Sequence, residues 1–390
     1  MTLDLPRHLR VAIASLLALA LLSANVALAC TSLIYRDQAG RVYFGRTLEL
    51  AMELPYRVAA FPSGLAYTSR TAPNAAPVTW TTRYRMLAVA VPDTGPDDLK
   101  IIEGFNEAGL TFSLLAFASA AGPRASALRT RAALAAIDLG AFTLGQFATV
   151  AEVRAALAAQ PILLTPLGPV AGEPSPFHFA LHDRAGNSIV VEFVNGQQFV
   201  HDNPVGVMTN GPSLPWHLTN LGNYSFLRNT DVSTGQFGKL AVSQPDSGIA
   251  TQGLPASNTS VGRFVRAAYY AQYAERVAAP DDAVRTLAHI MNNFDRPRNI
   301  TIDLRGSSGE GLGVATAPGA AVPDFSTEYT SWTALTDLDR SSLYLRTYGA
   351  MNYTKFDLNA LARITRTQSI PLASLNGMSG DGTVALIAAQ

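Results

Sequence analysis

The sequence predicts a layered α+β fold, because runs of strands are separated by pairs of helices instead of alternating with single helices. The clearest single element is a hairpin over residues 188–200, whose turn is Asn195-Gly196, the pair that favours a tight two-residue turn. A second hairpin is expected over residues 33–46, with Gly40 in its turn. Later strands are expected near Tyr329–Asp337 and Ser342–Tyr348.

Four helices are expected from stretches rich in strong helix formers or with helical periodicity. They cover Ser126–Leu139, Val150–Ala159, Val261–Val277 and Asp281–Asn293. Neither an internal repeat nor a long linker divides the chain, so we expect one domain from residue 30 to residue 390.

Composition excludes several classes of function. The chain has 29 basic and 29 acidic residues and no basic cluster, so no electrostatic footprint for nucleic acid is present. The six histidines form no zinc-binding helical pair, and the glycines near residue 310 match no dinucleotide fingerprint. No G-x-S-x-G nucleophile elbow occurs either. We therefore expect no cofactor and no metal.

The first residues have the pattern of a secretory signal. Arg7 and Arg10 precede an apolar run from Val11 to Leu22, and small residues follow at Ala27-Leu28-Ala29. The run is too short to span a membrane comfortably, so stable membrane insertion is not expected. Residues 1–29 are thus predicted to be a signal peptide, and the mature protein to be exported, periplasmic or secreted.

Cleavage after Ala29 would make Cys30, the only cysteine, the first residue of the mature chain. A free α-amine titrates near pH 7.7 to 8 and a thiol near about 8.5, so the amine can accept the thiol proton. Three alternatives are a buried structural cysteine, a lipid-modified cysteine, and a cleavage site one or two residues away. Two observations argue against lipidation. Lipoprotein signals usually have a branched apolar residue three positions before the cysteine and a small residue two before it, and Ala27 and Leu28 reverse that order. Thr31–Tyr35 also has the pattern of a strand, whereas lipoproteins usually continue with a flexible linker.

Several short motifs together resemble the choloylglycine hydrolase family of linear amide hydrolases, which includes bile-salt hydrolases and penicillin V acylases. They are Cys30 followed by Tyr43-Phe44-Gly45-Arg46-Thr47-Leu48-Glu49, then Asn106-Glu107-Ala108-Gly109-Leu110, Met208-Thr209-Asn210-Gly211-Pro212, Trp216-His217 and Arg263-Phe264-Val265-Arg266. The resemblance implies a four-layer α-β-β-α sandwich of two antiparallel sheets, with Cys30 as an N-terminal nucleophile.

The resemblance also implies roles for two residues near Cys30. Arg46 lies sixteen residues after Cys30, where the family has an arginine beside the thiol, and a nearby cation favours the thiolate. Glu49 stands where the family usually has Asp, and we expect it to orient the α-amine. Without the family, Glu49 would be interpreted as a surface carboxylate.

Three further residues take their roles from the resemblance. Asn210 matches the family's oxyanion-hole asparagine, although alone it would be interpreted as a turn residue. Ala116 stands where relatives carry Asn or Tyr, and its backbone N–H is expected to be the second oxyanion donor. Arg263 is expected to complete the polar network around the thiol; alternatively it could lie on a solvated helix face.

The expected function is hydrolysis of a linear amide through a thioester acyl-enzyme. The segment 51–67, with Ala116 and Phe117, suggests a pocket for an apolar or aromatic acyl group. The substitution at Glu49 favours a penicillin V acylase or N-acyl-homoserine-lactone acylase over a bile-salt hydrolase, which remains an alternative. A noncatalytic exported binding protein or lipoprotein on the same fold is another, and a homo-oligomer is compatible with the sequence.

Overall fold

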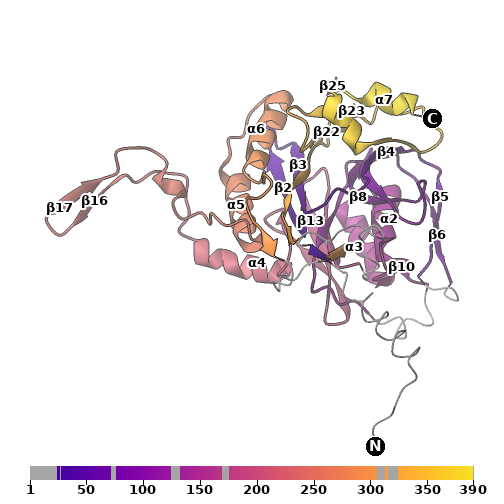
Figure 1. The fold of residues 1–390 in the computed structure, drawn as a ribbon, viewed down its shortest axis with the longest axis horizontal. Coiled ribbons are helices and arrows are strands. Elements are labelled where there is room, and N and C mark those ends of the chain that lie inside the picture. Colours follow the sequence, from indigo (N-terminus) through magenta and orange to yellow (C-terminus); the bar gives the residue numbers. More distant parts are fainter. Residues whose placement is uncertain are drawn as a thin grey trace, which may run out of the picture.

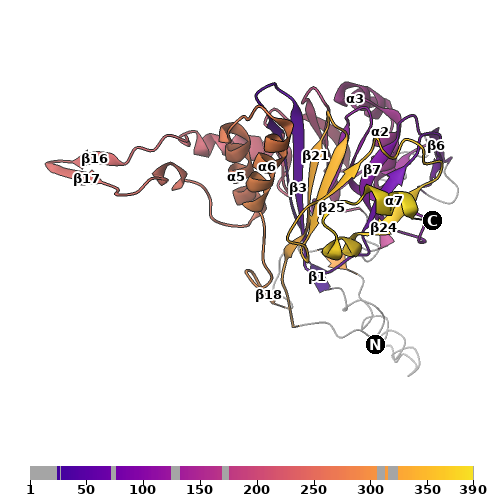
Figure 2. The ribbon, with the colours of Figure 1, turned by 90° about the horizontal axis from the view of Figure 1, so that it is seen from above.

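The centre of the protein is a pair of β-sheets packed face to face, seen in the computed structural model of Figure 1 and from above in Figure 2. The structure describes residues 24–26, 28–71, 76–123, 132–168, 175–304, 312–314 and 324–389. Helices cover the outer face of each sheet, which gives four layers in the order α-β-β-α. The predicted fold class is confirmed.

The first sheet has seven strands and carries the predicted nucleophile. Its order is β15 (Val207–Met208), β2 (Leu28–Arg36), β3 (Val42–Leu50), β21 (Tyr329–Asp337), β22 (Ser342–Thr347), β23 (Thr354–Asp357) and β25 (Gly380–Asp381). All neighbours are antiparallel except β23 and β25. The predicted hairpin over residues 33–46 is the β2–β3 pair, and β21 and β22 match the two strands expected near the C-terminal end.

The second sheet has eight strands, all antiparallel. Its order is β14 (Gln197–Asp202), β13 (Ser188–Val194), β12 (Phe177–His182), β9 (Thr111–Ala116), β8 (Leu99–Asn106), β7 (Met86–Pro92), β4 (Arg57–Phe61) and β24 (Gln368–Pro371). In the turn between β13 and β14, Asn195 and Gly196 have φ values of 52° and 78°, as the predicted tight turn requires. The C-terminal segment supplies the edge strand β24, which pairs with β4.

Two helices cover the seven-stranded sheet, α5 (Ser260–Tyr273) and α6 (Pro280–Asn292). The buried residues of α6, Ala283, Leu287, Ile290 and Met291, follow helical spacing and form one apolar stripe. At Gly45 of β3 an added Cβ would lie 2.8 Å from the Met291 Sδ, so α6 packs closely only because this position has no side chain. The helices predicted over 261–277 and 281–293 are thus confirmed, with the first ending at Tyr273.

The eight-stranded sheet is covered by α2 (Leu139–Gln146), and α3 (Val150–Ala159) is bonded to β14 through Arg154 and the Val200 carbonyl. The predicted helix over 150–159 is confirmed. The helix predicted over 126–139 is wrong at β10 (Leu134–Ala135), which pairs in parallel with β11 (Ile162–Leu163), whereas residues Ala136–Asp138 form a 3₁₀ turn ahead of α2. Residues 133–136 are all buried, so they form no single apolar stripe, and strand pairing overrides the helix propensity of alanine and leucine. Residues 126–131 lie outside the described residues.

The remaining elements are short and lie outside the two main sheets or on their rims. They are α4 (Leu214–Asn220), α7 (Thr383–Ala388) and the strand pairs β5 (Ala66–Ser69) with β6 (Val78–Thr81), β16 (Thr234–Phe237) with β17 (Leu240–Ser243), β18 (Asp303–Leu304) with β20 (Phe325–Ser326), and β1 (Ala24–Val26) with β19 (Leu312–Val314). The β16–β17 hairpin projects far from the body of the molecule (Figures 1 and 2). In the part of the chain that the structure describes, no helix is long and apolar enough to cross a membrane.

Candidate active site

Cys30 is the third residue of β2 and lies opposite Leu48 of β3. Side chains alternate between the two faces of a strand, so Cys30 and Arg46 project from the same face, toward the eight-stranded sheet. The Arg46 Nη2 lies 3.3 Å from the Cys30 Sγ. Both side chains are buried. The structure therefore places Arg46 beside the thiol, where the sequence predicts it.

Three contacts hold the Arg46 guanidinium from the side of the second sheet and one from its own sheet. It donates to the carbonyl of Ile102 at 3.0 Å and to that of Leu114, and its Nη1 lies 3.3 Å from the Glu103 Oε2. The Arg46 Cζ is 5.0 Å from the ring centroid of Trp332 on β21. These partners hold the guanidinium in one orientation, so its positive charge stays next to the thiol.

Asn210, two residues after β15 ends, joins the backbone of Cys30 to its surroundings. Its Oδ1 accepts from the Cys30 N at 2.8 Å and from the Arg263 Nη2 at 2.7 Å, while its Nδ2 donates to the Ala116 carbonyl at 2.9 Å. Because the first two partners are donors and the third is an acceptor, only this orientation of the amide satisfies all three. The amide nitrogen carries two N–H groups, and Ala116 takes only one.

Arg263 reaches the same cluster from the first turns of α5. It donates to the Cys30 carbonyl, to the Thr31 Oγ1 at 2.9 Å and to the Asn210 Oδ1. The side chain is only 1% exposed, which excludes a position on a solvated helix face. Burial lowers the pKa of Arg263, and the attraction of Glu49 opposes that effect. Arg263 thus holds the first residues of β2 in the network predicted for it.

Glu49 lies on the opposite face of β3 from Arg46, toward the helices. It is fully buried, which excludes the interpretation as a surface carboxylate. The Thr330 Oγ1 donates to its Oε1 at 3.3 Å, and its Oε2 has no hydrogen-bond partner among the described residues. Burial raises the pKa of Glu49 to about 7, against the attraction of Arg263. Ala29 is its cross-strand neighbour here, and Asn210 accepts from the Cys30 N, so contact between Glu49 and the amine stays a prediction.

In the uncleaved chain, where Ala29 precedes Cys30, replacing Glu49 by Gln is expected to make the free energy of unfolding less dependent on pH between about pH 4.5 and 7. The folded-state pKa is raised from 4.5 to about 7, so the folded protein binds more protons in this window and loses stability as the pH rises. Glu49 contributes on the order of 3 kcal/mol at most to this loss. The measurement is urea unfolding at several pH values.

Glu275→Gln, at an exposed carboxylate just past α5, is the matched control and should keep the wild-type pH dependence. If Glu49→Gln also keeps it, Glu49 is not a neutral carboxyl group in the fold.

Two groups of buried residues near this cluster were missed in the sequence. Glu103 of β8 is fully buried, and its Oε2 accepts from the Ser113 Oγ as well as contacting Arg46. Its only sequence signal is one acid inside the apolar run Ile101 to Phe105, a position that needs a buried cation or a proton.

The second missed group lies behind Asn210. The sequence suggests that His178 is an ordinary polar residue, but its Nδ1 lies 3.1 Å from the Glu192 Oε1 and its Nε2 lies 3.0 Å from the Thr209 carbonyl oxygen. His217 adds a contact of 3.0 Å from its Nε2 to the Asn210 carbonyl oxygen. The backbone that carries the Asn210 side chain is therefore held on both sides.

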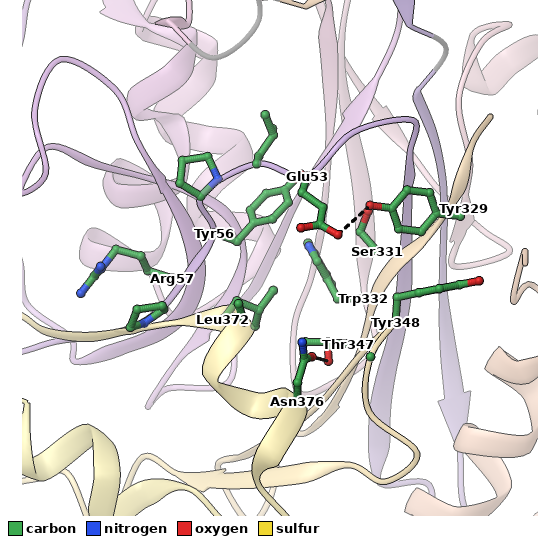
Figure 3. Close-up of a pocket in the computed structure, with 15 residues that line it drawn as sticks. Glu53, Tyr56, Arg57, Tyr329, Ser331, Trp332, Thr347, Tyr348, Leu372 and Asn376 are labelled. Atoms are coloured by element: carbon green, nitrogen blue, oxygen red, sulfur yellow. Dashed lines mark hydrogen bonds between the residues drawn. The ribbon is translucent and has the colours of Figure 1, made fainter. Parts of the chain in front are cut away.

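A pocket of about 320 Å³ is lined in part by Trp332 (Figure 3), the residue whose ring contacts Arg46. Its wall includes Tyr56 and Trp332, whose rings meet edge to face at 5.9 Å. The further lining residues are Glu53, Leu54, Pro55, Arg57, Tyr329, Ser331, Thr347, Tyr348, Gly349, Pro371, Leu372, Ala373 and Asn376. Part of the predicted segment 51–67 therefore lines a pocket.

Ala116 and Phe117, which the sequence also assigns to a pocket, are not part of this wall. Ala116 presents its carbonyl to Asn210, and Phe117 stacks on His178 at 5.0 Å.

The chemistry available here is that of a thiol, a fixed cation and a set of amide groups. Among the described residues, no group of three or more His, Cys, Asp or Glu side chains could hold a metal ion. A four-layer α-β-β-α sandwich with these groups on its inner strands is the architecture of N-terminal-nucleophile amide hydrolases.

Comparison with known proteins leads to the same class. The sequence profile of the linear amide C–N hydrolases, choloylglycine hydrolase family, matches residues 30–309. The chain belongs to this family, and it is a hydrolase of linear amide C–N bonds.

The chain is similar to relatives with two kinds of name. It is 26% identical over 331 residues to a bile salt hydrolase/transferase of Lactiplantibacillus plantarum, covering 85% of this chain and 92% of the relative. It is 27% identical over 261 residues to a penicillin V acylase of Pectobacterium atrosepticum, covering 66% and 63%.

Two solved structures share the fold. A variant of the conjugated bile acid hydrolase from Clostridium perfringens superposes with a TM-score of 0.72 at 22% identity, covering 88% of this chain and 97% of the other. Penicillin V acylase from Agrobacterium tumefaciens gives a TM-score of 0.69 at 21% identity, with coverage of 90% and 95%.

Proposed function

We propose that the chain is an exported amide hydrolase, periplasmic or secreted, that begins at Cys30 after removal of the signal peptide 1–29 and uses Cys30 as its nucleophile. The observation that carries this proposal is that both polar atoms needed for the reaction belong to the same cluster. The Cys30 N lies 2.8 Å from the Asn210 Oδ1, and the Cys30 Sγ lies 3.3 Å from the Arg46 Nη2. The family match, which begins at residue 30, supports the same start.

The proposed reaction runs through a thioester. The α-amine takes the thiol proton, the sulfur attacks the amide carbonyl, and the oxyanion accepts from the second N–H of Asn210 and the backbone N–H of Ala116. Collapse breaks the C–N bond, and the α-amine gives its proton to the leaving amine. Water, deprotonated by the same amine, then hydrolyses the thioester to the acid and the free thiol.

Arg46 and Arg263 have separate roles in this scheme. Arg46 stabilises negative charge at sulfur, since it touches the thiol. Arg263 is bonded to the carbonyl of Cys30 and to Asn210, so it fixes the end of the chain that carries the amine. Glu49 lies opposite Ala29, and we propose that it orients the amine once Ala29 is removed.

The substrate class is an amide of an apolar or aromatic acid, as hydrolysed by penicillin V acylases or N-acyl-homoserine-lactone acylases. The apolar and aromatic side chains around the 320 Å³ pocket support this proposal. Bile-salt hydrolysis is the second candidate, favoured by the names of several relatives. Release of phenoxyacetate, a medium-chain fatty acid and cholate from their amides separates the three substrate types.

The first experiment is N-terminal sequencing with intact-mass measurement on the protein recovered from the exported fraction. The expected result is an unmodified Cys30 as the first residue. A lipid-modified Cys30, or a chain that keeps residues ahead of it, would remove the proposed base and contradict the mechanism. The same result would favour a noncatalytic binding protein or lipoprotein.

A further inference from the structure

Glu103 competes with the thiol for one positive charge. The Arg46 guanidinium contacts the Cys30 Sγ through Nη2 and the Glu103 Oε2 through Nη1, both at 3.3 Å. Arg46 and Glu103 are fully buried, so water does not screen either charge, and the other hydrogen-bond acceptors of the guanidinium, the carbonyls of Ile102 and Leu114, are neutral. Two acids that share one buried cation cannot both ionise as easily as either would alone.

We propose that Glu103 is a positioning residue that balances the charge of Arg46 and thereby favours the thiol form of Cys30 in the free protein. When Glu103 is ionised, the thiol faces a neutral ion pair instead of an uncompensated cation. The hydrogen bond from the Ser113 Oγ favours this ionised form of Glu103. The proposed reaction requires a protonated thiol. The α-amine takes the thiol proton and later donates it to the leaving amine.

Burial does not prevent this ionisation. It raises the pKa of Glu103 to about 7, while Arg46 and the Ser113 hydroxyl lower it. Above neutral pH Arg46 is therefore compensated. The other titratable or charged groups acting on the cluster are Tyr56, Arg263 and the proposed α-amine, with Glu49, Glu328 and Arg296 acting on Arg263 from the helix side.

The test is a pH titration of the thiolate ultraviolet absorbance. Cys30 is the only cysteine, and the absorbance of the 13 tyrosines can be subtracted with Cys30→Ala titrated in parallel. In Glu103→Gln the cation is uncompensated, so the midpoint of thiolate formation is expected to fall by about 1 to 3 pH units. Glu103→Asp keeps the charge and should restore a midpoint near that of the wild type. A midpoint that is unchanged or raised in a folded Glu103→Gln protein would overturn the proposal.

Ser113→Ala provides an independent test if Glu103→Gln does not fold. Loss of the hydroxyl donor disfavours the carboxylate, so the midpoint should move in the same direction by a smaller amount, and an unmoved midpoint would overturn the proposal. Glu275→Gln, at the exposed carboxylate, serves as the control and should leave the midpoint unchanged. A purely structural role for Glu103 would lower the melting temperature without moving the midpoint.

Only the catalytic role of this charge balance rests on the proposed function of Cys30 as nucleophile; the charge balance itself does not. The absorbance measurement requires no hydrolysis and no free N-terminus, so it can succeed when the substrate panel or the N-terminal sequence fails.

Discussion

Cys30→Ala is expected to abolish amide hydrolysis, with a loss of kcat of at least about 10⁴-fold, while the fold remains intact. The substitution removes the atom proposed to attack the carbonyl, and no other cysteine is present to replace it. Alanine fits the space and leaves the backbone contacts to Asn210 and Arg263 unchanged. The measurement is kcat on the best amide of the panel, with circular dichroism as the check on folding.

Ser32→Ala is the matched control, because Ser32 is a small buried residue two positions along the same face of β2. Its Oγ donates to the Met208 carbonyl at 3.2 Å, so its loss should reduce stability by about 1 kcal/mol and leave kcat within a few-fold. Turnover retained in Cys30→Ala would refute the nucleophile, whereas an equal loss in both variants would point to damage of the strand.

Asn210→Ala is expected to lower kcat by about 10² to 10³-fold, the usual cost of an oxyanion donor. The change also removes the acceptor shared by the Cys30 N and Arg263, so the chain end that carries the amine loses its anchor. Because the donor acts on charge that forms in the transition state, the loss should fall mainly on kcat and little on KM.

Asn210→Asp separates the two roles of Asn210. The carboxylate keeps an acceptor for the Cys30 N and Arg263 but has no N–H for the oxyanion, so kcat should fall nearly as far as in Asn210→Ala while the fold is kept. Asn223→Ala, at an exposed asparagine beyond α4, should have no effect. Wild-type kcat in Asn210→Asp would show that Asn210 anchors the chain end and stabilises no oxyanion.

Local patterns were enough to predict most of the architecture. The β13–β14 hairpin is encoded by Asn195-Gly196, and the α6 helix by its apolar spacing, so both follow from neighbours in sequence. The helix predicted over 126–139 failed where a parallel strand pair with β11 decides the conformation. That pairing partner lies nearly thirty residues away and leaves no local signal.

The site depends still more on distant residues. Cys30, Arg46, Asn210 and Arg263 come from β2, β3, the turn after β15 and α5, so their meeting could be predicted only through the family resemblance. Glu103 was missed for a related reason. A single acid in an apolar strand shows that a partner exists, but not that the partner is the arginine beside the thiol.

The position of Cys30 inside β2, and not at its end, bears on when the proposed cleavage ahead of Cys30 could occur. Ala29 and Leu28 continue the ladder opposite Glu49 and Leu50, so the bond ahead of Cys30 lies within paired backbone, and both Ala29 and Cys30 are buried. A peptidase needs that backbone extended and unpaired in its own cleft. If the chain is cut ahead of Cys30 as proposed, the cut is expected before this part of the sheet closes, because in the folded chain the bond is paired and buried.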